Sequence, residues 1–265
     1  MTAGTSLFIS HGAPTFAIEP GRAGPLLTQL GKTLPRPQAL LVVSPHWMTR
    51  EISVGTSARP ATIHDFGGFP DALYRIEYPA PGHPALAKEA AELLASAGYP
   101  VSLDAERGLD HGAWVPLAYL YPDADVPVFQ VSLPANIDAA GAWKLGATLA
   151  PLAARGVLIV GSGSLTHNLY EFRQSHGRDE AYAVEFVEWV RAAVVAGDAD
   201  RLVHALERAP HAARAHPTAE HFLPLLVAAG AAAPKTGVEV LPGGMTHGVL
   251  SMESYRFGLA RSGAA

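Results

Sequence analysis

The sequence contains no cysteine, and this absence removes several kinds of chemistry at once. Without a thiol the chain can form no disulfide, cannot hold a metal ion through sulfur and has no cysteine nucleophile. Any bound metal ion must therefore be held by histidine, aspartate or glutamate side chains. The sequence also lacks an apolar run near the ~18 residues of a membrane span, and it lacks a cleavable secretory signal. We expect a soluble, cytoplasmic protein that does not enter a membrane.

The sequence has no excess of positive charge. Its 19 Lys and Arg residues stand against 24 Asp and Glu residues, so the formal net charge is −5 at pH 7, and no block of like charges occurs. Such a chain has no electrostatic footprint for nucleic acid or for an anionic membrane. We therefore expect its partners to be small molecules.

A glycine-rich segment at 161–164 follows an apolar run but lacks the patterns of two common enzyme classes. Its Gly-Ser-Gly-Ser order does not have the Gly-x-Ser-x-Gly spacing of a serine nucleophile elbow. It also has neither the glycine pattern of a dinucleotide-binding fold nor the Gly-Lys-Ser/Thr end of a phosphate-binding loop. The segment favours neither a serine hydrolase nor a nucleotide-binding enzyme.

What the sequence does contain is enough apolar material for a core and a regular alternation of strands and helices. Of the 265 residues 49% are hydrophobic, and we expect one domain over 1–265 with an ordered core from about 5 to 258. Apolar runs predict strands at 5–10, 40–43, 101–103, 126–133, 157–160, 238–241 and 249–257, and helical patterns occur at 24–34, 83–97, 110–119, 139–155, 179–196, 199–208 and 216–229. The Gly- and Pro-rich segment 49–81 is expected to be a long functional loop. This order predicts an α/β fold with a largely parallel central sheet flanked by helices.

Three histidines, His11, His46 and His167, follow predicted strands directly or through a short turn. Ligands of open α/β sheets bind beyond the carboxyl ends of the strands, where parallel strands meet at one edge. We therefore expect these histidines to lie close together. Imidazoles and carboxylates suit divalent transition metals such as Fe(II), Zn(II) and Mn(II), and a catalytic metal needs about three protein ligands. The pattern therefore indicates a metal centre.

The other histidines divide into candidate ligands and ordinary surface residues. Spacing alone leaves four candidates for the third metal ligand, which are His111, His216, Glu220 and His221. His64 and His247 lie in loop-like regions and stay open as functional residues. The remaining four, His83, His176, His204 and His211, lie in helical or charged stretches and are expected to be solvated.

Several short motifs occur in a fixed order along almost the whole chain. They are HGAP at 11–14, PHW at 45–47, TIHDFGGFP at 62–70, DHGAW at 110–114, HNL at 167–169 and PTAEHFLP at 217–224. With this order the chain resembles the class III extradiol ring-cleavage dioxygenases of the LigB type, specifically the DOPA 4,5-dioxygenase branch. The resemblance implies a LigB-type α/β fold and a non-haem metal enzyme that cleaves the ring of an aromatic diol with O2.

Carried over motif by motif, the resemblance implies metal ligands at His11, His46 and His221 and an acid/base histidine at His167. It implies Fe(II) for activity, and zinc as an ion that the purified protein could hold. His221 stands where more distant protocatechuate-type relatives have a glutamate, so three histidines would hold the metal. Glu220 would then be a hydrogen-bonding partner of His221 or an alternative ligand. His111 and His64 would contact the substrate or O2.

Two other functions stay open on the sequence alone. A metal-dependent hydrolase would use the same three histidines to activate water, although no clear carboxylate base lies beside them. A non-catalytic, Memo-like scaffold would share the fold without the reaction, because fold does not imply function. The acid/base candidate His167 argues against the scaffold.

Overall fold

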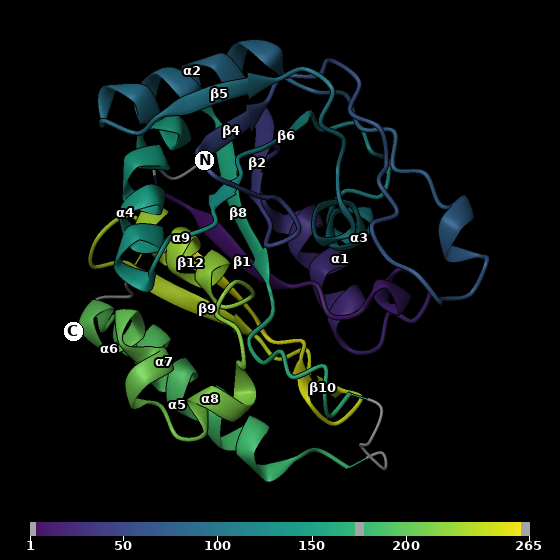
Figure 1. The fold of residues 1–265 in the computed structure, drawn as a ribbon, viewed down its shortest axis with the longest axis vertical. Coiled ribbons are helices and arrows are strands. Elements are labelled where there is room, and N and C mark those ends of the chain that lie inside the picture. Colours follow the sequence, from purple (N-terminus) through teal and green to yellow (C-terminus); the bar gives the residue numbers. More distant parts are fainter. Residues whose placement is uncertain (1–3, 173–177, 261–265) are drawn as a thin grey trace.

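The computed structural model describes residues 4–172 and 178–260, which form a central six-stranded sheet with helices on both faces (Figure 1). The strand order is β6-β2-β8-β1-β12-β9. These strands are β1 (Ser6–Ser10), β2 (Ala39–Val43), β6 (Val128–Gln130), β8 (Val157–Gly163), β9 (Gly237–Leu241) and β12 (Ser254–Leu259). The first four in this order run parallel, whereas β12 pairs antiparallel with both β1 and β9. The predicted α/β fold with a largely parallel sheet is confirmed.

Both faces of the sheet are buried, because alternate side chains of the central strands enter different cores. In β2, Leu41 and Val43 pack into one core and Leu40 and Val42 into the other. The first core also takes in α2 (Pro84–Ser96), α4 (Ala139–Leu149), α5 (Ala181–Ala196) and α9 (Leu223–Ala231), and the second takes in α1 (Ala23–Thr33) and α3 (His111–Leu120). Burial on both faces explains why the parallel strands read as continuous apolar runs.

Short elements complete the fold. The strand pairs outside the main sheet are β3 (Met48–Thr49) with β7 (Leu133–Pro134), β4 (Ile52–Gly55) with β5 (Val101–Asp104), and β10 (Met245–Thr246) with β11 (Leu250–Ser251). The short helices are η1 (Pro14–Ala17), η2 (Leu73–Arg75), η3 (Ala150–Arg155), α6 (Ala199–Val203), α7 (Ala205–Arg208) and α8 (Ala212–Ala215). Within the described ranges, no helix has both the length and the apolar character needed to cross a membrane.

The segment 49–81 contains a strand that its composition conceals. β4 lies at its start and pairs in parallel with β5, so the prediction of an uninterrupted loop was wrong for residues 49–55. Ile52 and Val54 are buried, and this packing outweighs the Gly- and Pro-rich surroundings. The predicted strand 126–133 was also wrong as one element, because it is divided between β6 and β7.

The predicted helix 216–229 begins later than its sequence suggests. His216 caps the end of α8, and α9 starts only at Leu223, with Pro224 in its first turn. Proline fits the first turn because the N–H that it lacks has no helical partner there. Pro224 therefore marks the start of the helix, and His221 lies in a turn before it.

Candidate metal centre

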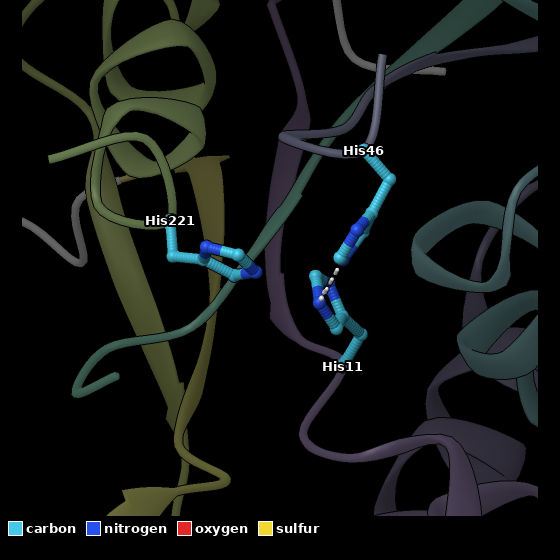
Figure 2. A group of neighbouring side chains, drawn as sticks. All are labelled: His11, His46 and His221. Atoms are coloured by element: carbon cyan, nitrogen blue, oxygen red, sulfur yellow. Dashed lines mark hydrogen bonds between the residues drawn. The ribbon is translucent and has the colours of Figure 1, made fainter. Parts of the chain in front are cut away.

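Three histidines meet at the carboxyl ends of the parallel strands. His11 directly follows β1, His46 follows β2 after a short turn, and His221 lies in the turn before α9. The Nε2 atoms of His11 and His46 are 3.2 Å apart. The ring centroid of His221 lies 5.5 Å from that of His11 and 5.1 Å from that of His46. Figure 2 shows the three rings pointing toward one another from separate segments, and one nitrogen of each lies within 4.8 Å of the others.

The nitrogen positions fit an ion held between the rings. Two imidazole nitrogens bound at about 2.0–2.1 Å to one ion lie roughly 3 Å apart at tetrahedral or octahedral angles. The 3.2 Å between the Nε2 atoms of His11 and His46 matches this separation. The Nε2 atom of His221 is buried and has no hydrogen-bond partner among the described residues. A buried polar atom without a partner carries a free-energy cost, which a bound ion would remove.

Ser162 fixes the position of the proton on His11. The Ser162 hydroxyl, in β8, donates to the carbonyl oxygen of Gly112. Its oxygen can therefore accept from Nδ1 of His11, which lies 3.0 Å away. His11 consequently carries its proton on Nδ1 and presents a bare Nε2 to the centre, as a metal-binding imidazole must.

A buried network holds the turn that carries His46. The carboxylate of Asp110, the N-cap of α3, accepts from the Ser44 hydroxyl and from Arg107, each at 2.8 Å. Gln130 adds a third donor at 2.8 Å. Ser44 also accepts from the backbone N–H of His46 at 3.2 Å, and Arg107 donates to the His46 carbonyl oxygen at 3.3 Å. The backbone of His46 is therefore fixed from both sides by one carboxylate-centred network.

His221 is positioned by the contact between β8 and the turn before α9. The carbonyl oxygen of His221 accepts from the backbone N–H of Ser164 at 2.9 Å. A Cβ at Gly163 would lie only 2.3 Å from that oxygen, so the approach requires glycine. The Nδ1 atom of His221 lies 3.2 Å from Oε1 of Glu220. In this geometry Glu220 is the hydrogen-bonding partner of the ring, which leaves Nε2 free for the centre.

Two residues beside the rings, Asp65 and Ser162, received no role from the sequence. Oδ2 of Asp65 lies 3.5 Å from Nδ1 of His46, and Oδ1 lies 3.0 Å from Nδ1 of His111. Burial alone would raise the pKa of Asp65, but the hydrogen bonds from His111 outweigh it and lower the pKa to about 2. Asp65 directly follows His64 within the 62–70 motif, and this carboxylate in a histidine-bearing loop was the signal that could have identified it.

Burial keeps the three rings neutral. It lowers the pKa of His46 to about 4, and it lowers the pKa values of His11 and His221 well below their ordinary range. The neighbouring histidines lower the pKa values of His11 and His221 further, because two positive rings would repel each other. Neutral imidazole is the form that binds a metal ion, so the centre needs no proton release at neutral pH.

The three rings open onto a cavity of about 480 Å³, a volume typical of a small-molecule site. His111 and His167 also line this cavity. Its apolar wall consists of Phe66, Phe69, Leu169, Phe172 and Leu250. Trp47 and Trp114, the tryptophans of the 45–47 and 110–114 motifs, are buried in the core and do not belong to the lining.

The predicted acid/base histidine lies against the predicted third ligand. The ring of His167 is stacked on that of His221, with centroids 3.5 Å apart and an interplanar angle of 8°. His64 is the predicted substrate contact that the structure does not bring into the cavity lining. Its Nε2 lies 3.0 Å from the carbonyl oxygen of Ile76, and its ring lies edge-on to Phe66 with centroids 5.8 Å apart.

The remaining histidines lie away from the three-ring group. His216 is buried with its Nε2 against the carbonyl oxygen of Leu165 at 2.9 Å, so it is a core residue here. The ring of His247 is tilted by 42° against that of Phe172, with centroids 4.1 Å apart, and it lines a neighbouring cavity. His83 caps α2, while His204 and His211 pair with Asp200 and Glu185 at the surface. His176, predicted to be solvated, lies outside the described residues.

Comparison with known proteins identifies the family of the chain. Residues 7–258 match the family described as the catalytic LigB subunit of aromatic ring-opening dioxygenase. The chain belongs to the LigB family. The family and the type of fold expected from the ordered motifs are thereby confirmed.

Two LigB relatives and one solved structure cover nearly all of the chain. A 4,5-DOPA dioxygenase extradiol of Beta vulgaris is 40% identical over 256 residues, which cover 95% of this chain and 96% of the relative. A protein of the same name from Escherichia coli (strain K12) is 42% identical over 259 residues, covering 96% and 94%. The crystal structure of the uncharacterized protein JW3007 from Escherichia coli K12 gives a TM-score of 0.78 at 36% identity, over 96% of this chain and 100% of that one.

Proposed function

We propose that this LigB-family protein is an extradiol dioxygenase that opens the ring of a catechol-type, DOPA-like substrate with O2, at a metal ion held by His11, His46 and His221. The observation that carries the proposal is the arrangement of these three rings. Each has a polar partner beside Nδ1 and offers Nε2 to the same centre. The family match and the names of the relatives support the reaction class. We further propose that residues 1–265 form one catalytic domain.

Fe(II) is proposed as the metal of the active protein, and zinc as an ion that the purified protein could also carry. Three neutral imidazoles suit either ion, because nitrogen ligands are shared by both metals. When bound, Fe(II) would lower the pKa of a catechol hydroxyl and supply the redox chemistry that the reaction with O2 requires, which zinc does not have.

His167 is proposed as the acid/base residue. Burial lowers its pKa to about 4, an effect that the nearby carboxylate of Glu220 opposes only in part. The ring is therefore neutral near pH 7, and it lines the cavity where a catechol would lie. A neutral imidazole in this position can accept the proton of a substrate hydroxyl and later return it.

His111 is proposed as a direct substrate contact, and His64 as an indirect one. Asp65 accepts the hydrogen bond from Nδ1 of His111, so the Nε2 atom of that ring is free to accept from a substrate hydroxyl in the cavity. His64 is held by the backbone of Ile76 and reaches the cavity only through Phe66. We therefore expect His64 to act on substrate binding by keeping Phe66 in place.

The cavity wall favours a flat aromatic ring. Phe66, Phe69 and Phe172 present aromatic surface to the cavity, and Leu169 and Leu250 add aliphatic surface. Aromatic rings pack favourably edge-to-face or offset against one another, in addition to the apolar area that they bury. The expectation that no carboxylate lies beside the histidines was wrong, because Asp65 and Glu220 lie against His46 and His221. Neither carboxylate lines the cavity, so they give a hydrolase base no support, and a scaffold does not account for the aromatic wall.

The test is anaerobic reconstitution of the metal-free protein with Fe(II), followed by addition of DOPA and other catechols in air. We expect a yellow ring-cleavage product with Fe(II) and none with zinc, measured by visible absorption and oxygen uptake. His46→Ala should abolish both metal binding and product, whereas His204→Ala, at the surface, should change neither. Oxygen uptake no greater than that of protein-free Fe(II) across the catechol panel would refute the proposal. Zinc-dependent ester hydrolysis in the same preparation would indicate a hydrolase instead.

A further inference from the structure

One carboxylate serves two histidines of different roles. Oδ1 of Asp65 accepts from the backbone N–H of His111 at 2.9 Å and from its ring Nδ1 at 3.0 Å. Oδ2 of the same side chain lies 3.5 Å from Nδ1 of His46. The two rings lie with centroids 4.0 Å apart. A proposed metal ligand and a proposed substrate contact therefore lie beside the same carboxylate, which is hydrogen-bonded to His111 and within ion-pair distance of His46.

The loop that carries Asp65 is fixed against α3 and the segment leading into it. The indole N–H of Trp114, in α3, donates to the carbonyl oxygen of Ile63 at 3.0 Å. The backbone N–H of Ile63 donates to the carbonyl oxygen of Leu109 at 2.8 Å. Both contacts hold the loop at Ile63, two residues before Asp65, and they reach the chain on either side of His111, at Leu109 and Trp114. The carboxylate and the His111 ring therefore keep their relative positions.

A second metal site at His46, Asp65 and His111 is the alternative use of this group, whose ligand atoms lie within 4.8 Å of one another. It conflicts with the first site. His46 offers Nε2 to the centre with His11, and it could bind a second ion through Nδ1 only by losing its ring proton altogether. A partner that accepts the Nδ1 proton of His46 is compatible with the centre, whereas a second cation is not.

We infer that Asp65 is a positioning residue that holds the proton of both His46 and His111 on Nδ1, so that His46 offers a bare Nε2 to the metal and His111 offers a bare Nε2 to the substrate. The inference rests on the proposed function for the roles of the two rings. It makes the Asp65 carboxylate the outer partner that orients a metal-bound imidazole. The same side chain consequently links metal binding to the substrate side of the cavity.

The substitution Asp65→Asn should act on the two histidines unequally. An amide has one acceptor oxygen and one donor NH₂ group. The backbone N–H of His111 cannot reverse its direction, so the amide oxygen must face His111. The NH₂ group then faces His46 and donates to Nδ1, which places the ring proton on Nε2. His46 thereby loses the lone pair that it offers to the metal, while His111 keeps its original tautomer.

Asp65→Ala should weaken metal binding less than Asp65→Asn does. Alanine removes the acceptor but adds no donor, so His46 remains free to place its proton on Nδ1 when a metal binds. A purely structural role for Asp65 predicts the opposite order, because alanine also removes the hydrogen bonds of His111. Asp71→Asn is the matched control, since Asp71 is an exposed carboxylate in the same loop.

The experiment combines ¹⁵N imidazole NMR of the zinc-loaded protein, in which the ion replaces the hydrogen bond between the Nε2 atoms of His46 and His11, with zinc titration against a competing chelator. We expect His46 to change from an Nδ1–H to an Nε2–H tautomer in Asp65→Asn, with zinc affinity about 10–100-fold below that of Asp71→Asn. Asp65→Ala should lie between the two. The inference would be overturned if Asp65→Asn left the His46 tautomer unchanged or kept a zinc affinity within about threefold of that of the control. It would also be overturned if Asp65→Ala bound zinc more weakly than Asp65→Asn. No catechol is used, so the tautomer change in Asp65→Asn, found together with a wild-type protein that never cleaves a catechol, would refute only the proposed function.

Discussion

The imidazole of His167 lies parallel to that of His221, with ring centroids 3.5 Å apart and an interplanar angle of 8°. The proposed proton acceptor thus packs against a proposed metal ligand. Burial lowers the pKa values of both rings, and the neighbouring His167 lowers that of His221 further, because two positive rings would repel each other at this distance. The stack therefore joins two neutral rings at pH 7, and it excludes a state in which both rings are positive.

Replacing His167 by phenylalanine should separate proton transfer from metal binding. A phenyl ring can keep the stacked contact with His221 but cannot accept a proton, so we expect zinc affinity within about threefold of wild type. With Fe(II), kcat for a catechol should fall by about 10²–10⁴-fold, the usual contribution of an acid/base group. The measurements are chelator competition and oxygen uptake, and His204→Phe at the surface is the control. Unchanged turnover in His167→Phe would remove His167 from the mechanism.

Removing the hydroxyl of Ser162 should weaken the metal centre without touching a ligand. Ser162→Ala deprives Nδ1 of His11 of its acceptor, and we expect metal affinity to fall by about 10–100-fold. Ser164→Ala is a matched control. The Ser164 hydroxyl is buried like that of Ser162, but it lies just after β8 and donates to the carbonyl oxygen of Thr166. Equal zinc affinities in the two variants, measured by the same titration, would contradict the role given to Ser162.

A methyl group at Gly163 should displace His221. Its Cβ would lie 2.3 Å from the His221 carbonyl oxygen, so the turn before α9 must move away from β8. We expect Gly163→Ala to lower the free energy of unfolding by about 1–3 kcal/mol and to reduce zinc affinity as well. Gly67→Ala tests the specificity of this effect, because a Cβ at Gly67 meets nothing within 4 Å. The measurements are urea unfolding and zinc titration of both variants. Similar stabilities and similar zinc affinities in the two variants would show that the close contact of β8 with His221 does not determine the position of that ring.

The metal-free protein should lose stability as the pH falls from 7 toward 4. Burial lowers the pKa values of His167 and His216 from 6.5 to about 4. Between these pH values the two histidines are protonated in the unfolded chain but stay neutral in the folded protein. Each such histidine should lower the free energy of unfolding by about 1.4 kcal/mol per pH unit within this window. The low pKa of Asp65 adds a further loss only below about pH 4.

Urea unfolding at several pH values, in the presence of a chelator, measures this slope. His216→Gln removes one titrating group outside the metal centre and should flatten the slope by about 1.4 kcal/mol per pH unit. Constant or rising stability between pH 7 and pH 5 would show that these histidines are protonated in the folded protein.

The sheet and two of its histidines could be predicted from the sequence because their signal is local. The continuous apolar run in β2 reports a strand buried on both faces, and strand order alone places His11 and His46 at one edge. β4 escaped prediction because its short apolar pattern lies among glycines and prolines, and only its pairing with β5 defines it. The local pattern was therefore enough to predict β2, whereas β4 is defined only by its pairing with another strand.

The third histidine and the partners of the rings depend on contacts distant in sequence. His221 belongs to a turn whose position is set by Gly163 and Ser164. Spacing alone therefore did not separate it from the other candidates, His111, His216 and Glu220. The family resemblance singled it out, and the structure brings its ring to the other two. Asp65 reaches His46 and His111 across the fold, and no periodicity in the sequence encodes such a side-chain contact.

The position of β1 inside the sheet makes the three rings unequal in mobility. β1 is paired on one side with β8 and on the other with β12, and the backbone N–H of His11 continues the ladder by donating to Gly163 at 2.9 Å. His46 and His221 lie in turns instead, where local opening costs less than global unfolding. The amide of His11 should therefore exchange its hydrogen only when the whole protein unfolds. Release of a bound ion should begin at the two turns and end at β1.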